Sequence, residues 1–516
     1  MIDNVYNVPL TRSTLRPLSS PFYFPESFYE DIPHSGDSPS PSSEEDDAKT
    51  ATDYISKSSI SARMISEWST PTLILLVSVM CMVHIWSMIP VYSEFEHTFE
   101  YVAQSDGKIV YTYTFQLRDN PVTRWFQVWC ATTTGEVIQA VDFANKASYK
   151  VVQIPRRNPT EGFSMVVNPE FIASSPNGWT DGKATEGNNV ITRDPRGKTT
   201  PSIRDGVFNT KFASTRPAGI AANVAAAAVN LFYVSNVMHD ISYQYGFTES
   251  AGNFQTNNFG KGGEGNDAVT INALNSSKVN AAKFFAPPDG QPGVMNMFRF
   301  TYTRPNRSGG LDNGVVIHEY THGITSRLTG GPATSGCLST DEARGMGEGW
   351  SDMMAMMVLA KKSDTATTGI PIAAYAINRS AGLRSHLYTT DMKVNPLTYS
   401  DLQTRLKVHA IGEVWASLLW QVYWNLVTKH GFSTNLYDTK QSAGNVVTMK
   451  IIMGGLMLQS CNPTLLGARD AIIAADKLHY KGANKCEIYK GFARRGLGLG
   501  ATDARTNDFS VPSECQ

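Results

Sequence analysis

The sequence predicts an α+β protein with a strand-rich N-terminal lobe and a mainly helical C-terminal lobe. Residues 98–146 alternate between apolar and polar side chains, which is typical of β-strands. Residues 150–300 are rich in Asn, Gly, Thr and Pro around short apolar runs, which indicates further strands and loops. Residues 370–516 carry apolar side chains at helical spacings, most clearly over 408–427. With 516 residues, the chain should hold more than one domain.

The N-terminal region differs in composition from the rest of the chain. Residues 1–68 include an acidic stretch rich in Ser and Pro at 35–47, which predicts a disordered extension. Residues 69–93 contain no Asp, Glu, Lys or Arg, and their apolar part is close to the length that spans a bilayer. One interpretation is a signal-anchor helix with a cytosolic N-terminus, which would tether the protein to a membrane. The alternative is a signal peptide that starts at Met64. Both interpretations export the remainder of the chain.

Two further patterns are better explained by structure than by a second function. Residues 260–265 fit the glycine pattern of dinucleotide-binding loops, but residues 268–271 favour a strand where such a loop leads into a helix. His239 and Asp240, within a predicted helix over 221–245, are expected to form a satisfied buried pair rather than a second metal site. The formal net charge of −1 gives no indication of a nucleic-acid partner.

The most specific pattern in the chain is His-Glu-x-x-His at residues 318–322. On a helix, His318 and His322 lie on one face about one turn apart, so their imidazoles can point at one metal ion. Two histidines suit a tetrahedral zinc ion, and Glu319 can act as general base on a metal-activated water without binding the metal. A solvated helix with two chance histidines is disfavoured, because an apolar run at 315–317 precedes the motif.

Catalytic zinc sites usually have three protein ligands and a water, so a third ligand is needed. The best candidate is Glu348, which lies among glycines at 345–349 that predict a turn before a helix starting at Ser351. Asp352 follows Glu348 by about one helical turn and shares its face. If Glu348 binds zinc, Asp352 can accept the outer N–H of a ligating histidine and fix its orientation.

At these residues the chain resembles the fungalysins, extracellular zinc metalloproteases of fungi that are distantly related to thermolysin. The resemblance covers most of residues 147–516. Besides the zinc motifs, its long matches are at 236–240, 252–255, 257–268, 287–290 and 408–416. It implies one Zn²⁺ ion held by His318, His322 and Glu348. It also implies that Glu319 is the catalytic base.

The fold that the resemblance implies is thermolysin-like, with two lobes and the zinc helix on the floor of the cleft between them. Residues 94–146 would be a propeptide remnant, shorter than the usual prodomain of the family. Residues 147–310 would form the strand-rich lobe and residues 311–516 the zinc-binding helical lobe. The implied activity is that of a secreted zinc endopeptidase made as a zymogen. An exopeptidase, an inactive binding protein and a membrane-tethered adhesion protein are the alternatives.

Two other positions gain a role from the resemblance. His409 begins the most apolar helix and, as in thermolysin-like enzymes, would donate to the oxyanion of the tetrahedral intermediate from across the cleft. A structural histidine at the helix N-terminus is the alternative. In the relatives, the segment at 280–284 forms a strand that hydrogen-bonds the substrate backbone. Lys283 stands where the family commonly has Asn.

The remaining features fit an exported protein. Cys337, Cys461, Cys486 and Cys515 allow two disulfides, with three possible connectivities. Sequons for N-linked glycosylation occur at Asn275, Asn306 and Asn378. We expect protein or peptide substrates, the chain's own prosegment as a partner, no nucleic acid, and a monomer. Calcium binding is left open.

Overall fold

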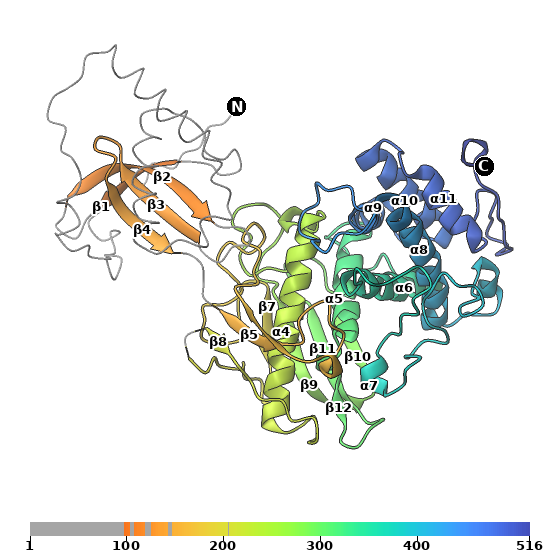
Figure 1. Cartoon of the computed structure of the whole chain (residues 1–516), viewed down its shortest axis with the longest axis horizontal. Helices are drawn as coiled ribbons and strands as arrows, with labels where there is room; N and C mark the ends of the chain where they lie inside the picture. Colours follow the sequence, from red (N-terminus) through yellow and green to blue (C-terminus); the bar gives the residue numbers. More distant parts are fainter. Residues whose placement is uncertain (1–97, 104–107, 119–124, 143–146, 205) are drawn as a thin grey trace, which may run out of the picture. The chain divides into compact units, whose positions relative to one another are not determined.

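A computed structural model describes residues 98–103, 108–118, 125–142, 147–204 and 206–516 (Figure 1). These residues fall into two compact units, one within residues 1–144 and one within residues 145–516. The expected α+β composition is confirmed, with strands dominating the earlier part of the described chain and helices the later part. The predicted segments 1–68 and 69–93 lie outside the described residues.

The first unit is a four-stranded antiparallel sheet with the order β1-β2-β3-β4. Its strands are β1 (Thr98–Ala103), β2 (Ile109–Arg118), β3 (Trp125–Ala131) and β4 (Val137–Asp142). The alternating pattern of this region therefore predicted its strands correctly. Tyr101 and Tyr111 lie opposite each other in the β1–β2 register, and both rings are exposed.

The second unit contains a mixed sheet with the order β10-β11-β9-β7. Its strands are β7 (Val190–Arg193), β9 (Val269–Val279), β10 (Ala282–Phe285) and β11 (Val294–Phe300), with β12 (Arg307–Ser308) paired to β11. β7, β9 and β11 run parallel, and β10 is antiparallel to β11. Within the described part of the chain, β10 is an edge strand whose outer side has no strand partner. A smaller sheet pairs β6 (Ser164–Val167), β5 (Ser148–Val151) and β8 (Val207–Phe208) in that order.

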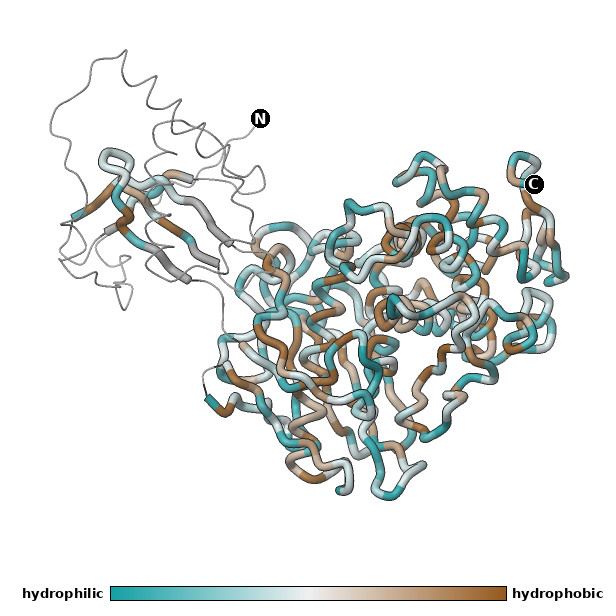
Figure 2. Tube along the Cα trace, in the orientation of Figure 1, coloured by the Kyte–Doolittle hydropathy of each residue, from teal (hydrophilic) through white to brown (hydrophobic). Residues whose placement is uncertain are grey.

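Helix α4 (Ala221–Gln244) forms the centre of the second unit. It packs against β5, β7 and the helix α5 (Asn313–Leu328), which carries the His-Glu-x-x-His motif (Figure 1). Among the described residues it is the helix that is long and apolar enough to cross a membrane, but 83% of its most apolar window is buried in this fold. Its apolar character, visible along the chain in Figure 2, is therefore that of a core helix.

Buried polar contacts fix α5 at both ends. At its first residue, Asn313 donates to the carbonyl of Val152 (2.7 Å) and accepts from the amide of Asn230 on α4 (2.9 Å). Near its last residue, the fully buried Arg327 pairs with Asp267 at 3.0 Å. Arg327 also donates to backbone carbonyls between β10 and β11. A buried charge is tolerated only when it is fully paired, so these bonds tie α5 to the sheet.

The later part of the second unit is helical. Its helices are α6 (Asp341–Val358), α7 (Ala374–Ile377), α8 (Val408–His430), α9 (Gly444–Leu458), α10 (Leu465–Tyr480) and α11 (Lys485–Arg494). Two disulfides join Cys337 to Cys461 and Cys486 to Cys515, which selects one of the three connectivities left open by the sequence. The first links the loop after α5 to the loop after α9, and the second links α11 to the C-terminal segment.

The prediction of a turn at 345–349 and a helix start at Ser351 is wrong, because this stretch lies inside α6. The glycines serve helix packing instead. A Cβ on Gly349 would lie 2.7 Å from the carbonyl oxygen of Gly412 on α8, and a Cβ on Gly412 would lie 2.6 Å from the Cβ of Glu348. Small residues thus allow α6 and α8 to approach closely, and Glu348 lies at their crossing.

Candidate metal centre

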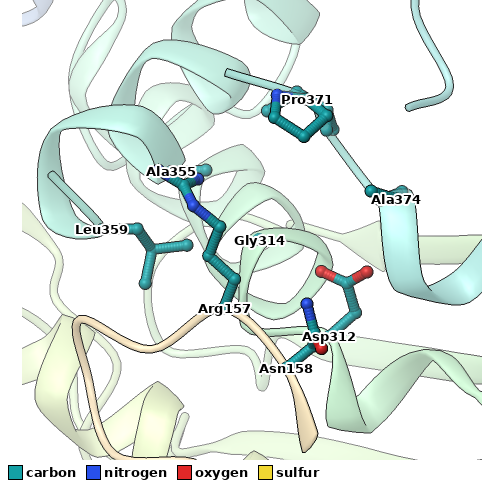
Figure 3. A pocket seen from close by; sticks show the side chains of 10 residues that line it. Arg157, Asn158, Asp312, Gly314, Ala355, Leu359, Pro371 and Ala374 are labelled. Carbon is teal, nitrogen blue, oxygen red and sulfur yellow. The ribbon is translucent and has the colours of Figure 1, made fainter. Parts of the chain in front are cut away.

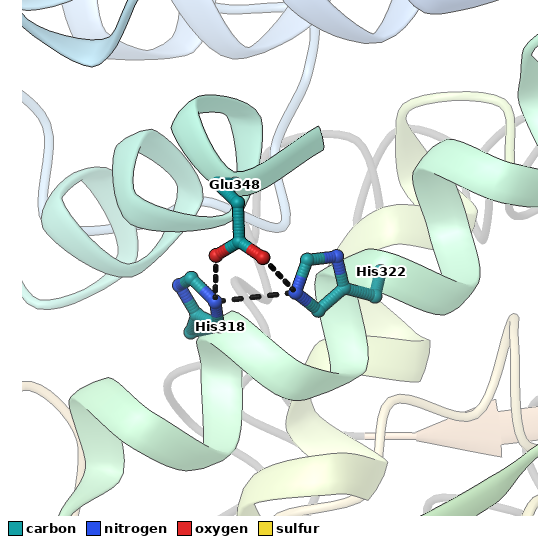
Figure 4. A group of neighbouring side chains, drawn as sticks. All are labelled: His318, His322 and Glu348. Atoms are coloured by element: carbon teal, nitrogen blue, oxygen red, sulfur yellow. Dashed lines mark hydrogen bonds and ion pairs between the residues drawn. The ribbon is translucent and has the colours of Figure 1, made fainter. Parts of the chain in front are cut away.

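Helices α5 and α6 bring three predicted ligands together (Figure 4). His318 Nε2 lies 3.2 Å from Glu348 Oε2, and His322 Nε2 lies 3.8 Å from Glu348 Oε1. The two histidine Nε2 atoms are 3.2 Å apart. One ligand atom from each residue lies within 4.8 Å of the others, a spacing that could hold a metal ion. The one-turn spacing of the histidines thus directs both rings at the carboxylate.

Asp352 lies one turn after Glu348 and holds His318 from behind. Its Oδ1 atom is 2.8 Å from His318 Nδ1, so the other ring nitrogen, Nε2, is the one that faces Glu348. Arg384 donates to both oxygens of Asp352, at 2.7 and 2.9 Å, and the Tyr388 hydroxyl donates to Oδ2 at 2.6 Å. Asp352 is fully buried, and these bonds fix its orientation.

Arg384 and Tyr388 were not found by reasoning from the sequence. They lie in the irregular segment between α7 and α8, far along the chain from both zinc motifs. Arg384 also approaches Glu348 Oε2 at 3.7 Å, so it adds a positive charge beside two carboxylates. No local periodicity or motif marks either residue, because their role arises only from the tertiary fold.

The electrostatics of the cluster favour a bound cation. Burial alone would lower the pKa of His318, but its contacts with Asp352 and Glu348 raise it to about 10. Burial lowers the pKa of His322 to about 4. Burial would raise the pKa of Glu348, but contacts with His318, His322 and His409 lower it to about 2. The pKa of Asp352 is held well below its usual range against burial, chiefly by Arg384. The cluster thus keeps its carboxylates ionised and attracts positive charge.

The residues present also fit a metal by their geometry. Among the described residues, the buried Oε2 atom of Glu348 has no hydrogen-bond partner, although His318 Nε2 is close to it. Buried polar atoms are normally hydrogen-bonded, so this atom requires an explanation. Two imidazole nitrogens and one carboxylate therefore converge as a set of donors that could hold a metal ion.

Glu319 lies next to His318 on α5 and is 6% exposed. Burial raises the pKa of its carboxyl to about 7, and the charge of Glu348 acts in the same direction. The positive charges of His318, Arg384 and Lys283 oppose this rise. A carboxyl that titrates near neutral pH can both accept and return a proton, which is the property of a general base.

His409 lies at the edge of the cluster. It is the second residue of α8, and its side chain is 62% exposed. Its Nε2 atom is 3.5 Å from Glu348 Oε2, which places a hydrogen-bond donor beside the predicted metal ligands. The close crossing of α6 and α8 brings His409 to this position.

The edge strand β10 packs beside α5. The ring of Phe284 lies against Gly323, where a Cβ would come within 2.9 Å of it, and against the ring of Tyr320. Lys283 precedes Phe284 in the strand and is exposed. The edge strand β10 therefore runs next to the helix that carries Glu319.

A separate pocket lies at the start of α5 (Figure 3). It is lined in part by Arg157, Asp312 and Leu359, and none of the predicted site residues lines it. Burial raises the pKa of Asp312 to about 6, and its carboxylate accepts a hydrogen bond from the backbone N–H of Ala376 at 3.2 Å. The backbone carbonyl of Asp312 accepts from Val315 N and Val316 N at the start of α5. We assign this pocket to the anchoring of α5.

Comparison with known proteins agrees with the geometry of the site. A sequence model of the fungalysin metallopeptidase family (M36) matches residues 148–501. The extracellular metalloproteinase MEP of Leptosphaeria maculans is 40% identical over 442 residues, which cover 80% of this chain and 68% of that protein. The extracellular metalloproteinase 1 of Trichophyton rubrum is 41% identical over 437 residues, which cover 81% of this chain and 68% of that protein.

The family match covers well over half of the chain and contains the three convergent side chains. Similar identity and coverage are found for the probable extracellular metalloproteinase 1 of Arthroderma benhamiae. These relatives are named as extracellular enzymes, in agreement with the export expected from the sequence. The chain therefore belongs to the fungalysin family of metallopeptidases, and it is a secreted metalloendopeptidase.

Proposed function

We propose that the protein is a zinc endopeptidase in which His318, His322 and Glu348 hold one Zn²⁺ ion. The observation that carries this proposal is the convergence of one ligand atom from each residue to within 4.8 Å of the others, with no hydrogen bond to Glu348 Oε2. Nitrogen and carboxylate donors of this number suit zinc and leave a position open for water or substrate. When bound, the ion supplies Lewis acidity to a water molecule and to the substrate carbonyl.

The remaining steps belong to side chains of the site. Glu319 takes a proton from the attacking water and passes it to the nitrogen of the leaving amine, for which its pKa of about 7 is suited. His409 donates a hydrogen bond to the oxyanion of the tetrahedral intermediate, which its position near Glu348 supports. Asp352, held by Arg384 and Tyr388, keeps His318 in the tautomer that presents Nε2 to the metal.

The substrate is proposed to bind as an added strand along the free side of β10. An edge strand beside the catalytic helix offers unpaired backbone groups to an extended peptide. This mode of binding fits an endopeptidase, because it requires no free terminus of the substrate.

The finer architecture follows the same proposal. Residues 147–310 form the strand-rich lobe and residues 311–516 the zinc-binding helical lobe of a thermolysin-like enzyme. Residues 94–146 are the end of a prosegment that is removed on maturation. N-terminal sequencing of the secreted protein tests this point: a start near Ala147 supports removal, whereas a start before residue 69 supports a membrane tether.

The central experiment compares processed wild-type protein with Glu319→Gln. Both are assayed for zinc content and for cleavage of quenched fluorescent peptides blocked at both termini. We expect one zinc ion in each, and cleavage by the variant slowed by roughly 10²- to 10⁴-fold, the usual contribution of a general base. Glu186→Gln, which changes an exposed glutamate, is the matched control.

Each other outcome has a clear meaning. Wild-type protein without zinc overturns the assignment of the metal. Full activity in Glu319→Gln overturns the assignment of the base.

A further inference from the structure

The chain has three sequons for N-linked glycosylation, at Asn275, Asn306 and Asn378. The glycan is joined to the side-chain nitrogen of Asn and must remain in water on the folded protein. The sequon is recognised before folding is complete, so a site is compatible with the native protein only where the fold leaves that nitrogen free and exposed. The three sequons differ in this respect.

Asn275 lies in β9, paired through its backbone with Phe298 of β11. Its side-chain nitrogen donates to Asn296 Oδ1 at 2.9 Å, and its side-chain oxygen accepts from Ser277 N at 2.9 Å. Both polar atoms of the amide are therefore engaged in the sheet region, and a glycan would have to displace the contact with Asn296.

Asn306 is partly buried, and its side-chain oxygen accepts from Ala218 N at 3.0 Å. The third residue of its sequon, Ser308, is only 3% exposed, and its Oγ caps the turn that follows by accepting from Gly310 N. This sequon is built into the packed junction between β12 and α5.

Asn378 has the opposite surroundings. It is exposed and ends α7 with φ 54° and ψ 44°, a left-handed conformation that Asn tolerates well. Among the described residues, its side-chain amide takes part in no hydrogen bond. The next two residues of the sequon, Arg379 and Ser380, are also exposed. The side chain is thus free to carry a large polar group into solvent.

The loop that follows Asn378 holds the metal centre. It carries Arg384 and Tyr388, which both bond to Asp352. The loop exposes Arg379 and Leu383, the latter by 50%. Exposed loop segments are the preferred sites of proteolytic cleavage. A secreted protease is also exposed to cleavage by other copies of itself. A cut in this loop would release the residues that orient His318.

We propose that Asn378 carries an N-linked glycan and that this glycan shields the loop 378–388 from proteolysis. The proposal rests on secretion through a eukaryotic pathway and on the geometry of the loop, and it does not depend on the assignment of the catalytic base.

The first test is the intact mass of protein secreted by a eukaryotic host, before and after treatment with an endoglycosidase. Wild-type protein, Asn275→Gln and Asn306→Gln should each lose one glycan mass, whereas Asn378→Gln and Ser380→Ala should lose none. Ser380→Thr, which keeps the sequon, should restore the glycan. A glycan that persists in Asn378→Gln, or a wild-type protein with none, overturns the proposal.

The second test uses trypsin, because Arg379 adjoins the glycan site. The bond between Arg379 and Ser380 should be cut much faster in deglycosylated wild-type protein and in Asn378→Gln than in glycosylated protein. The exposed Arg196 provides an internal control, since its cleavage should not depend on the glycan. Equal rates of cleavage at Arg379 with and without the glycan overturn the shielding role.

Discussion

Two buried histidine–carboxylate pairs lie in the second unit, and they use their remaining polar atoms differently. In α4, His239 Nδ1 lies 3.0 Å from Asp240 Oδ1. In the metal centre, His318 Nδ1 lies 2.8 Å from Asp352 Oδ1. Both carboxylates are fully buried. By burial and by the contact between histidine and carboxylate, the two pairs are nearly equivalent.

The difference lies in what surrounds each pair. His239 Nε2 meets Gln255 Oε1 at 3.2 Å, so both ring nitrogens have partners. Asp240 accepts hydrogen bonds from the protein on both oxygens, from Phe171 N, Ser174 Oγ, Ser175 Oγ and Trp179 Nε1. In the metal centre, His318 Nε2 instead faces His322 Nε2 and a carboxylate oxygen without a hydrogen-bond partner.

A buried histidine beside a carboxylate is therefore not in itself a sign of a catalytic site. The α4 pair, expected from the sequence to be a satisfied structural pair, is confirmed as one. The metal centre is distinguished by donor atoms that converge on one point and are not satisfied by each other. This difference predicts that equivalent substitutions in the two clusters will affect different properties.

The largest effect is expected from Glu348→Gln. The substitution keeps the shape of the side chain but removes the negative charge that faces both histidines. Metal affinity should fall by more than the roughly 10- to 100-fold cost of losing a supporting residue, and peptide cleavage should be lost with it. Zinc content after dialysis and cleavage of blocked peptides are the measurements. A variant that retains both would show that Glu348 is not a ligand.

Asp352→Asn tests the orienting carboxylate. The amide cannot accept hydrogen bonds from Arg384, Tyr388 and His318 at the same time, so His318 loses its fixed orientation. We expect metal affinity or activity to fall roughly 10- to 100-fold. Competition with a zinc chelator measures this directly, because it reports affinity without relying on turnover.

Asp240→Asn is the matched substitution in the structural cluster, which consists of the His239–Asp240 pair and its hydrogen-bond partners. It should lower the thermal midpoint, since an unmade buried hydrogen bond costs about 1–3 kcal/mol. Zinc affinity and kcat/KM per folded molecule should remain those of wild type. If the two Asp→Asn variants behaved alike, the distinction between the clusters would be lost.

The sequence predicted one half of the metal centre better than the other. His318, Glu319 and His322 lie within one helix, so their common face follows from helical periodicity. Glu348 and Asp352 were also paired correctly by their spacing, although the helix start was misplaced. The glycines around Glu348 were taken as a turn because glycine weakens an isolated helix. In the fold they allow close contact with α8, a tertiary requirement that local propensity does not reveal.

The positions of Arg384, Tyr388 and β10 beside the site could not be predicted from local patterns. Arg384 and Tyr388 lie in an irregular segment, and their side chains reach Asp352 only because that segment folds back over α6. The free side of β10 results from the strand order of the sheet, which is a property of the whole unit. For β10, only the resemblance to known proteases suggested a role.

A pH-dependent effect on stability is expected near the His239–Asp240 pair, where Glu170 lies under the influence of the Asp240 charge. Burial, with a contribution from the charge of Asp240, raises the pKa of Glu170 from its ordinary 4.5 to about 8. Between these values the folded state keeps a proton that the unfolded state releases, so stability falls as pH rises. Glu170 alone can contribute a slope of up to about 1.4 kcal/mol per pH unit in this window.

Glu170→Gln removes this slope. The thermal midpoint of the variant should therefore fall less than that of wild type between about pH 5 and pH 8, with the largest relative gain at the alkaline end. Glu186→Gln, at an exposed position, is the control and should follow the wild-type curve. Parallel curves for Glu170→Gln and wild type would show that Glu170 is ionised in the folded protein.

The smallest effect is expected at the rim of the metal centre. Unlike the His239–Asp240 pair, this site is influenced by an exposed charged residue on β10. Lys283 is exposed, and its positive charge opposes the rise in the pKa of Glu319. Lys283 also contacts Lys278 and lowers the pKa of the Lys278 amino group. Two positive charges therefore lie beside the proposed substrate strand. Lys283→Asn should therefore lower kcat/KM for peptides with acidic residues relative to neutral ones.

The ratio of the two kcat/KM values should change by roughly two- to fivefold, the size expected for an exposed ion pair, and the change should shrink at high salt. Lys490→Asn, at an exposed position on α11, should leave the ratio unchanged. An unchanged ratio in Lys283→Asn would mean that the substrate passes β10 through backbone contacts alone. A salt-dependent ratio would instead show that Lys283 selects substrates by charge at the same strand.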